Sequence, residues 1–201
     1  MTNITIIGAG NMGSAIASLA VAGGNPVQVL SRTATAVDGT TAGTVGHPIA
    51  GDIVVLALPY GAVAEVLARY AGQLDGKTLV DITNPLDFAT FDSLVVEAGS
   101  SAAAEIAALV PTASVLKAFN TNFASTLVSG TVGSEKTTVL IAGDDSDAKA
   151  TLADVLAAAG IKAVDAGSLK RAHELEALGF LQLTLAAGGK TSWTSGFALA
   201  D

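Results

Sequence analysis

Cysteine is absent from this chain of 201 residues, and histidine occurs only twice, at His47 and His173. Without cysteine there is no disulfide, no thiolate nucleophile and no cysteine-ligated metal cluster. The two histidines lie far apart in the sequence and do not form a metal-ligand spacing. We therefore expect no metal site and no catalytic side chain, and we expect a bound organic cofactor to supply the chemistry.

Positive charge is also scarce, because 10 Lys and Arg face 18 Asp and Glu, for a net charge of −8. The basic residues form no cluster, which argues against nucleic-acid binding. Aromatic residues make up only 4% of the chain. No apolar run has the length of a membrane span, and the N-terminus lacks the basic segment of a signal peptide. We expect a cytoplasmic protein without a nucleic-acid or membrane partner.

Glycine is placed in a specific pattern near the N-terminus, where residues 3–13 read NITIIGAGNMG. An apolar strand pattern breaks into G-x-G-x-x-G and continues as a helix of small residues. Gly8 permits the tight turn, Gly10 allows a pyrophosphate to approach the backbone, and Gly13 lets the helix pack close to the strand. The N–H groups at Asn11 and Met12 would then meet the phosphates at the positive end of the helix. The motif predicts dinucleotide binding.

The second strand ends without an acidic residue, and this absence favours NADP(H) over NAD. NAD enzymes usually carry Asp or Glu about 20 residues beyond the glycine motif, where it binds the ribose 2′-hydroxyl. Here Ser31 and Arg32 occupy that place, and the first acid of the chain is Asp38. A guanidinium and a hydroxyl bind the extra phosphate of NADP. The next basic residue is Arg69, so we expect Arg32 to be the one local cation.

Strand-like and helix-like segments alternate along the rest of the chain. This predicts an α/β fold of the Rossmann type, with a doubly wound, mainly parallel sheet. We expect an NADP-binding domain over residues 1–166 and a small C-terminal helical lobe over 167–201 that closes the substrate cleft. Ligands bind at the carboxyl ends of such strands. The predicted cofactor contacts there are Leu58, Pro59, Asn84, Pro85 and Phe119.

Several segments together resemble the deazaflavin-dependent NADP reductase family, and the similarity extends over essentially the whole chain. They are residues 8–13, 31–32, 52–59, 117–121, 143–145, 164–167 and 175–178. The cytoplasmic domains of the six-transmembrane ferric reductases look like relatives. The resemblance implies that NADPH passes hydride directly to a flavin-like or deazaflavin-like ring held between the Rossmann domain and the lobe. Alignment of donor and acceptor would then replace a catalytic nucleophile.

Two departures from the family leave the hydride acceptor open. The segment 33–51 is short and rich in Gly and Thr, which predicts that the helix and strand usual after the Ser-Arg pair are missing. Residues 188–196 offer little basic grip for the anionic tail of a deazaflavin. The acceptor is therefore a deazaflavin, a plain flavin, a quinone or a metal chelate.

Other functions are also open. Residues 7–16 are similar to the opening of pyrroline-carboxylate reductases, which reduce imines but carry a longer helical C-terminal domain. A hypothesis of a different class is a non-enzymatic NADP(H)-binding redox sensor. The apolar segment 169–187 leaves a homodimer open, because one of its faces could pack against a second subunit.

Overall fold

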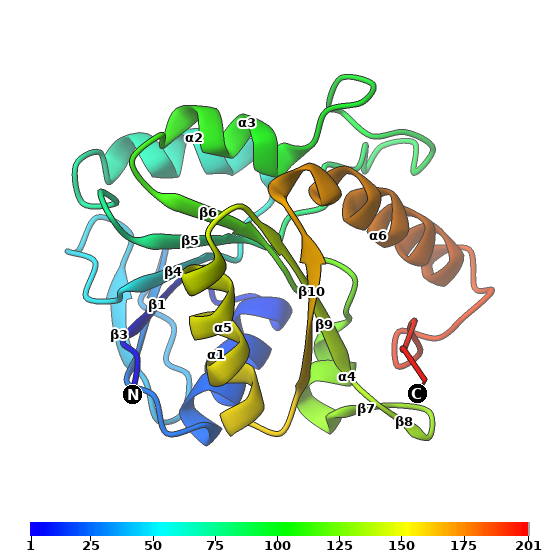
Figure 1. Ribbon diagram of the computed structural model, residues 1–201, viewed down its shortest axis with the longest axis horizontal. Coiled ribbons are helices and arrows are strands. Elements are labelled where there is room, and N and C mark those ends of the chain that lie inside the picture. Colours follow the sequence, from blue (N-terminus) through cyan, green and yellow to red (C-terminus); the bar gives the residue numbers. More distant parts are fainter. Residues whose placement is uncertain (201) are drawn as a thin grey trace.

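The computed structural model describes residues 1–200, and its centre is a mainly parallel sheet (Figure 1). The strands are β1 (Ile4–Ile7), β2 (Val27–Ser31), β3 (Thr41–Thr44), β4 (Ile53–Leu56), β5 (Thr78–Asp81), β6 (Ser114–Lys117), β9 (Thr138–Gly143) and β10 (Lys162–Gly167). They pair in the order β10-β9-β6-β5-β4-β1-β2-β3. Strands β1 to β6 are mutually parallel, in the 3-2-1-4-5-6 order of dinucleotide-binding folds. β9 runs antiparallel to β6, and β10 runs parallel to β9. The predicted Rossmann-type fold is confirmed.

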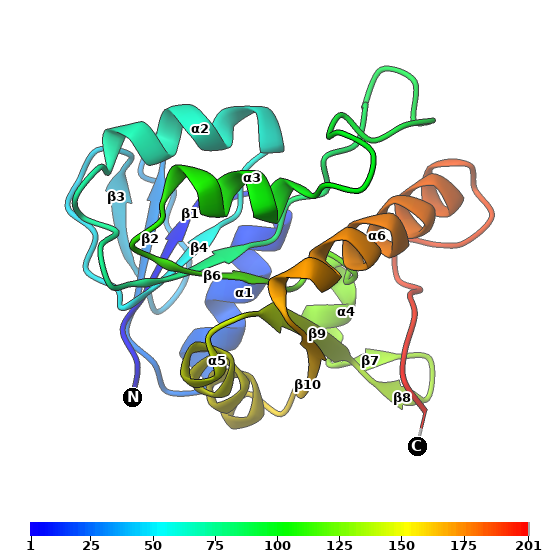
Figure 2. The same ribbon diagram turned by 45° about the horizontal axis from the view of Figure 1, so that its top comes forward.

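Helices cover both faces of this sheet (Figures 1 and 2). The helices α1 (Asn11–Ala22), α4 (Ala124–Ser129) and α5 (Ser146–Ala158) pack on one face, and α2 (Tyr60–Arg69) and α3 (Ala102–Leu109) pack on the other. Ile6 and Ile7 point to opposite faces and belong to separate cores. All four residues of β1 are buried, as is typical of a parallel strand covered on both sides.

The C-terminal part begins with a short 3₁₀ turn, η1 (Leu169–Arg171), and continues into α6 (Ala172–Ala187). The tail after α6 returns toward the hairpin of β7 (Thr131–Val132) and β8 (Glu135–Lys136) (Figure 2). Because β10 extends to Gly167, the predicted boundary after residue 166 falls at the end of the sheet. The division into two domains stays a prediction. Within residues 1–200, no helix is both long and apolar enough to cross a membrane.

The segment 33–51 corrects one expectation from the sequence. β3 lies in this segment and pairs in parallel with β2, so the strand is present and the prediction that it is missing was wrong. No helix lies between β2 and β3, as expected. β3 escaped prediction because it is an edge strand of Thr, Ala and Gly with little buried apolar surface. The short helix α4 and the β7–β8 hairpin were not predicted either.

Candidate dinucleotide site and adjoining cavity

Two glycines are required by packing, Gly8 in the turn between β1 and α1 and Gly13 in the first turn of α1. Gly8 has a φ of +117°, and a Cβ at this residue would lie 2.0 Å from the carbonyl oxygen of Ala57. A Cβ at Gly13 would lie 2.0 Å from the carbonyl oxygen of Gly8. Only glycine fits at either position, and the start of α1 is therefore held tightly against the ends of β1 and β4.

Gly10 differs, because no protein atom lies within 4 Å of the position that its Cβ would take. Its φ of −75° is open to any residue, so the fold itself does not require glycine here. Gly10 is the N-cap of α1, and neither a capping side chain nor an acidic residue occupies the first turn of the helix. The open space lies at a helix N-terminus, where N–H groups and the helix dipole favour an anion.

A cavity of about 860 Å³ opens in front of this turn, and we call it the cofactor cavity. Six of the predicted site residues line it, namely Gly8, Gly10, Ser31, Arg32, Leu58 and Pro59. Arg69, from α2, lines it as well. Arg32 is therefore not the only cation near the predicted 2′-phosphate position. Arg69 is bonded to Glu65 at 2.7 Å, whereas no ion pair or hydrogen bond joins the Arg32 side chain to another residue described in 1–200.

The turn after β2 holds its shape through a local hydrogen bond. Ser31 is buried, and its Oγ accepts a hydrogen bond from the backbone N–H of Thr35 at 2.9 Å. Ala34, inside the turn, has a φ of +50°, in the left-handed region that non-glycine residues rarely adopt. The turn presents Arg32, Thr33 and Thr35 to the cofactor cavity. A strained turn beside a ligand-sized cavity is typical of a binding site.

A second cavity, of about 850 Å³, lies between α1, the segments that follow β5 and β6, α4 and α6, and we call it the lobe cavity. Four of the predicted site residues line it, namely Asn11, Met12, Asn84 and Phe119. The glycine turn separates the two cavities, since Gly8 and Gly10 face one and Asn11 and Met12 face the other. Gly13 and Pro85 line neither cavity. The predicted cofactor contacts at the strand ends are thus divided between two adjacent cavities, and their role stays a prediction.

Phe119 occupies a strained turn in the wall of the lobe cavity. Its φ is +62°, which is an outlier for a bulky residue, and its side chain is only 2% exposed. The N–H of Asn120 donates to Ala118 O at 2.8 Å and closes the turn. The Nδ2 of Asn120 then donates to Leu175 O on α6 at 2.7 Å and to Asn84 Oδ1 at 3.0 Å. The turn therefore joins the end of β5 to α6.

Gly179 marks the closest approach of α6 to the sheet. A Cβ at this residue would lie 2.4 Å from Asn84 Oδ1 and 2.9 Å from Asn120 O. The sequence analysis missed this residue. Its signal was an isolated glycine inside an apolar helical pattern, which often has a packing reason.

A buried charge network connects α6 to the strands beneath it. Lys117 Nζ lies 2.7 Å from Asp81 Oδ2 and 2.8 Å from Glu176 Oε1, and it donates to Thr83 O at 2.6 Å. The Glu176 carboxylate also accepts hydrogen bonds from the first N–H groups of α3, at 2.9 and 3.2 Å. Burial raises the pKa of Glu176, and the Lys117 ammonium opposes that rise. In the sequence, Lys117 and Glu176 belong to two separate motifs of the family resemblance, residues 117–121 and 175–178, and nothing there indicates that they meet.

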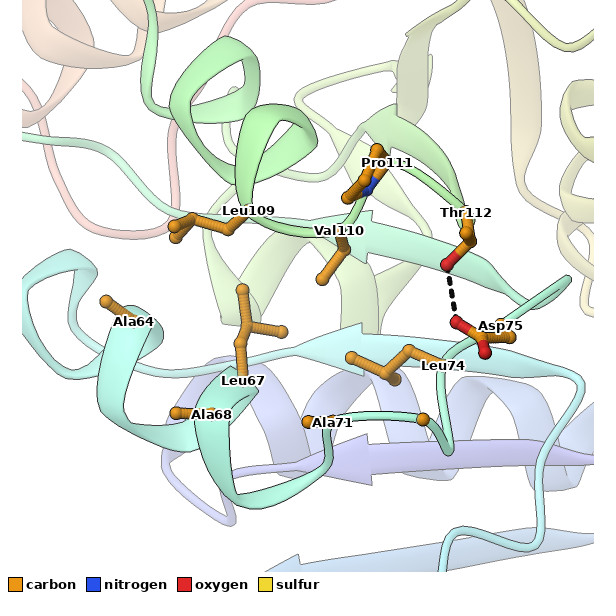
Figure 3. A pocket seen from close by; sticks show the side chains of 11 residues that line it. Ala64, Leu67, Ala68, Ala71, Leu74, Asp75, Leu109, Val110, Pro111 and Thr112 are labelled. Carbon is orange, nitrogen blue, oxygen red and sulfur yellow. Dashed lines mark hydrogen bonds between the residues drawn. The ribbon is translucent and has the colours of Figure 1, made fainter.

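A third hollow, of about 350 Å³, lies between the C-terminal ends of α2 and α3 (Figure 3). Its wall is apolar, with Leu67, Leu74 and Leu109 around the opening, and the Thr112 hydroxyl donates to Asp75 at its edge. This hollow lies near the amino ends of β5 and β6, whereas ligands of such sheets bind at the carboxyl ends. None of the predicted site residues lines it.

Comparison with known proteins agrees with the resemblance found in the sequence. Residues 3–85 match the family described as NADP oxidoreductase, coenzyme F420-dependent. Over 112 residues, or 56% of this chain, the sequence is 38% identical to the metalloreductase STEAP3 of Rattus norvegicus. Over 132 residues, or 64% of this chain, it is 27% identical to the F420-dependent NADP reductase of Methanocaldococcus jannaschii.

These two matches cover 22% of the rat protein and 59% of the archaeal protein. A solved structure from Arthrobacter sp. FB24, described as a candidate F420-dependent NADP reductase, matches over its full length and over all of this chain. It has a TM-score of 0.87 and 26% identity. Residues 3–85 are thus similar to the family of NADP oxidoreductases described as coenzyme F420-dependent, and the whole chain is similar to the Arthrobacter structure.

Proposed function

We propose that this protein is an NADPH-dependent oxidoreductase that passes hydride directly to a flavin-like or deazaflavin-like acceptor. NADP(H) would bind in the cofactor cavity and the acceptor in the lobe cavity. The observation that carries the proposal is the position of the glycine turn, which forms a wall of both cavities. A dinucleotide whose pyrophosphate meets the start of α1 would extend from one cavity toward the other.

The residues of the cofactor cavity suit NADP(H). The open space at Gly10 admits a pyrophosphate, and α1 offers free N–H groups beside it. Arg32, with no ion pair in the described chain, and the Ser31 hydroxyl would bind the 2′-phosphate. When bound, NADPH supplies the hydride, and the protein's task is to align the two rings and exclude water.

The lobe cavity would hold the hydride acceptor. Asn84 and Phe119 lie at the carboxyl ends of β5 and β6, where α6 closes over them. The cavity volume of about 850 Å³ is in the range of small-molecule sites. We include a cytoplasmic location and a homodimer in the same proposal.

Deuterium transfer tests the reaction. NADPH stereospecifically labelled at C4 should pass one label directly to a deazaflavin, because the C5 of that ring retains a transferred hydride. With a flavin the label should be lost to solvent after reduction. Mass spectrometry of the product reads both results. Loss of the label to solvent from the deazaflavin would contradict direct transfer.

The same assay separates the alternatives. Turnover of a cyclic imine, with no turnover of flavin, deazaflavin or quinone, would identify an imine reductase of the pyrroline-carboxylate type. NADPH binding without turnover of any acceptor would identify a redox sensor.

A further inference from the structure

The buried network of Lys117, Asp81 and Glu176 carries more negative than positive charge. Asp81 Oδ1 accepts a hydrogen bond from the Thr83 N–H at 2.8 Å, and Asp81 Oδ2 accepts one from Lys117 Nζ at 2.7 Å. Glu176 Oε2 accepts from the Ala102 N–H at 2.9 Å, and Glu176 Oε1 lies 2.8 Å from Lys117 Nζ. A protonated carboxyl would need an acceptor for its own hydrogen, whereas each of these oxygens faces a donor. Both carboxylates are therefore ionised, and one ammonium faces two negative charges.

Little in the surroundings cancels the remaining charge. The three side chains are at most 1% exposed, so water and salt screen them poorly. The N-terminus of α3 supplies only about half a positive charge. Glu105, in the first turn of the same helix, adds another carboxylate. No acidic or basic residue is among the described residues that line the lobe cavity, so its wall brings no compensating cation.

The network lies directly behind the strand ends that form the wall of the lobe cavity. Lys117 Nζ donates to Thr83 O at 2.6 Å, and the next residue, Asn84, lines the cavity. Phe119, two residues beyond Lys117, lines it as well. The buried charge is thus within one or two residues of two predicted cofactor contacts.

Tyr60 shows that the same charge is felt beside the cofactor cavity. It follows Pro59, which lines that cavity, and its hydroxyl donates to Glu105. Burial and this hydrogen bond raise the pKa of the Tyr60 hydroxyl, and the charges of Glu105, Glu176 and Asp81 raise it further. Excess negative charge that opposes a new anion favours a cation at the same place.

We infer that the carboxylates of Asp81, Glu176 and Glu105 stabilise the oxidised, cationic nicotinamide over the reduced one, and so favour the release of hydride from NADPH. This inference rests on the proposed function, which brings the nicotinamide to these strand ends. The reduced ring is neutral. Removal of hydride from its C4 atom, with both electrons of the C–H bond, leaves one positive charge on the ring. A fixed opposite charge nearby stabilises that charge as it develops. The three carboxylates act through space and do not contact the reacting atoms.

Glu176→Gln tests the inference, because it removes one charge and keeps the size of the side chain. Calorimetric titration with NADP⁺, NADPH and 2′,5′-ADP measures three affinities at about pH 8, where an ordinary imidazole is neutral. We expect the variant to lose about tenfold in affinity for NADP⁺ relative to NADPH. This ratio corresponds to a rise of about 30 mV in the potential of the bound couple. The probe 2′,5′-ADP has the 2′-phosphate but no nicotinamide, so its affinity should stay within about twofold.

Glu105→Gln is a second variant that leaves the buried hydrogen bonds intact. Because Glu105 is exposed, we expect a change in the same direction of only about two- to threefold at about 0.02 M salt, and a smaller one at about 0.5 M. Asp154→Asn is the matched control. It removes one exposed charge on α5, on the opposite face of the sheet from α3, and should leave the ratio unchanged. Circular dichroism shows whether Glu176→Gln is folded, and Glu105→Gln decides if it is not.

Two results would overturn the inference. One is an equal change in the affinities for NADP⁺ and NADPH in folded Glu176→Gln, and the other is a ratio in Glu105→Gln that matches the ratio in Asp154→Asn. Either result leaves the proposed function standing, because both cofactors still bind. If the wild-type protein binds neither NADP⁺ nor NADPH, the proposed function fails and the inference fails with it. If the ratio changes as expected but no acceptor is reduced, the inference holds and the proposed reaction fails.

Discussion

Arg32 presents its guanidinium to the cofactor cavity, and no ion pair joins it to another residue in the part of the chain that the structure describes. Arg32→Ala should weaken NADPH binding by about 1.5 to 3 kcal/mol, the scale of a hydrogen bond to a charged group. NADH lacks the 2′-phosphate, so its affinity should change little. Calorimetric titration of both cofactors measures the difference.

Arg69→Ala is the matched control for Arg32→Ala, because Arg69 lines the same cavity but forms an ion pair with Glu65. Arg69→Ala should weaken NADPH binding less than Arg32→Ala does. Equal affinity of the wild-type protein for NADPH and NADH would contradict the assignment of Ser31 and Arg32 to the 2′-phosphate.

At the scale of elements, α6 depends on Gly179 for its close packing on the sheet. Gly179→Ala would place a methyl group 2.4 Å from Asn84 Oδ1 and 2.9 Å from the backbone oxygen of Asn120, and because that backbone cannot turn aside, α6 would have to move. We expect acceptor affinity to fall by about tenfold or more, because α6 forms a wall of the lobe cavity and small misplacements are costly. NADPH affinity should stay within about threefold, because α6 does not line the cofactor cavity. Tryptophan quenching by 5-deazariboflavin and calorimetry with NADPH measure the two affinities.

Gly61→Ala is the matched variant on α2, where no atom lies within 4 Å of the new methyl group. It should leave acceptor binding unchanged and should not lower stability, since alanine is the better helix former. If Gly179→Ala behaves like Gly61→Ala, α6 is not held by the contact with Asn84 and Asn120.

At the scale of the whole molecule, the network of Lys117, Asp81 and Glu176 joins β5, β6, α3 and α6. Lys117→Met would leave two buried carboxylates without their cation, and we expect it to lower the free energy of unfolding by about 3 to 5 kcal/mol. Urea unfolding followed by circular dichroism measures the loss. Lys149→Met is the control, because its bridge to Asp165 is partly exposed and should contribute at most about 1 kcal/mol. Similar losses in the two variants would mean that the buried network does not stabilise the fold.

The sequence by itself determined the glycine turn, the Ser31 and Arg32 pair, and the order of the strands and helices other than β3, α4 and the β7–β8 hairpin. These features depend on residues that are adjacent or periodic in the chain, and backbone geometry and hydrophobic pattern constrain them directly. The edge strand β3 was missed because Thr41–Thr44 has almost no apolar signal.

Only the tertiary structure decided which distant residues meet. Arg69 joins Arg32 because α2 packs beside the turn after β2, and Gly179 meets Asn84 and Asn120 because α6 folds back over the strand ends. Lys117 and Glu176 lie in separate motifs, and packing alone brings their charges together. The uncharged wall of the lobe cavity is likewise a property of surfaces from several elements. No local rule encodes these contacts, because they depend on how the whole chain buries its apolar surface.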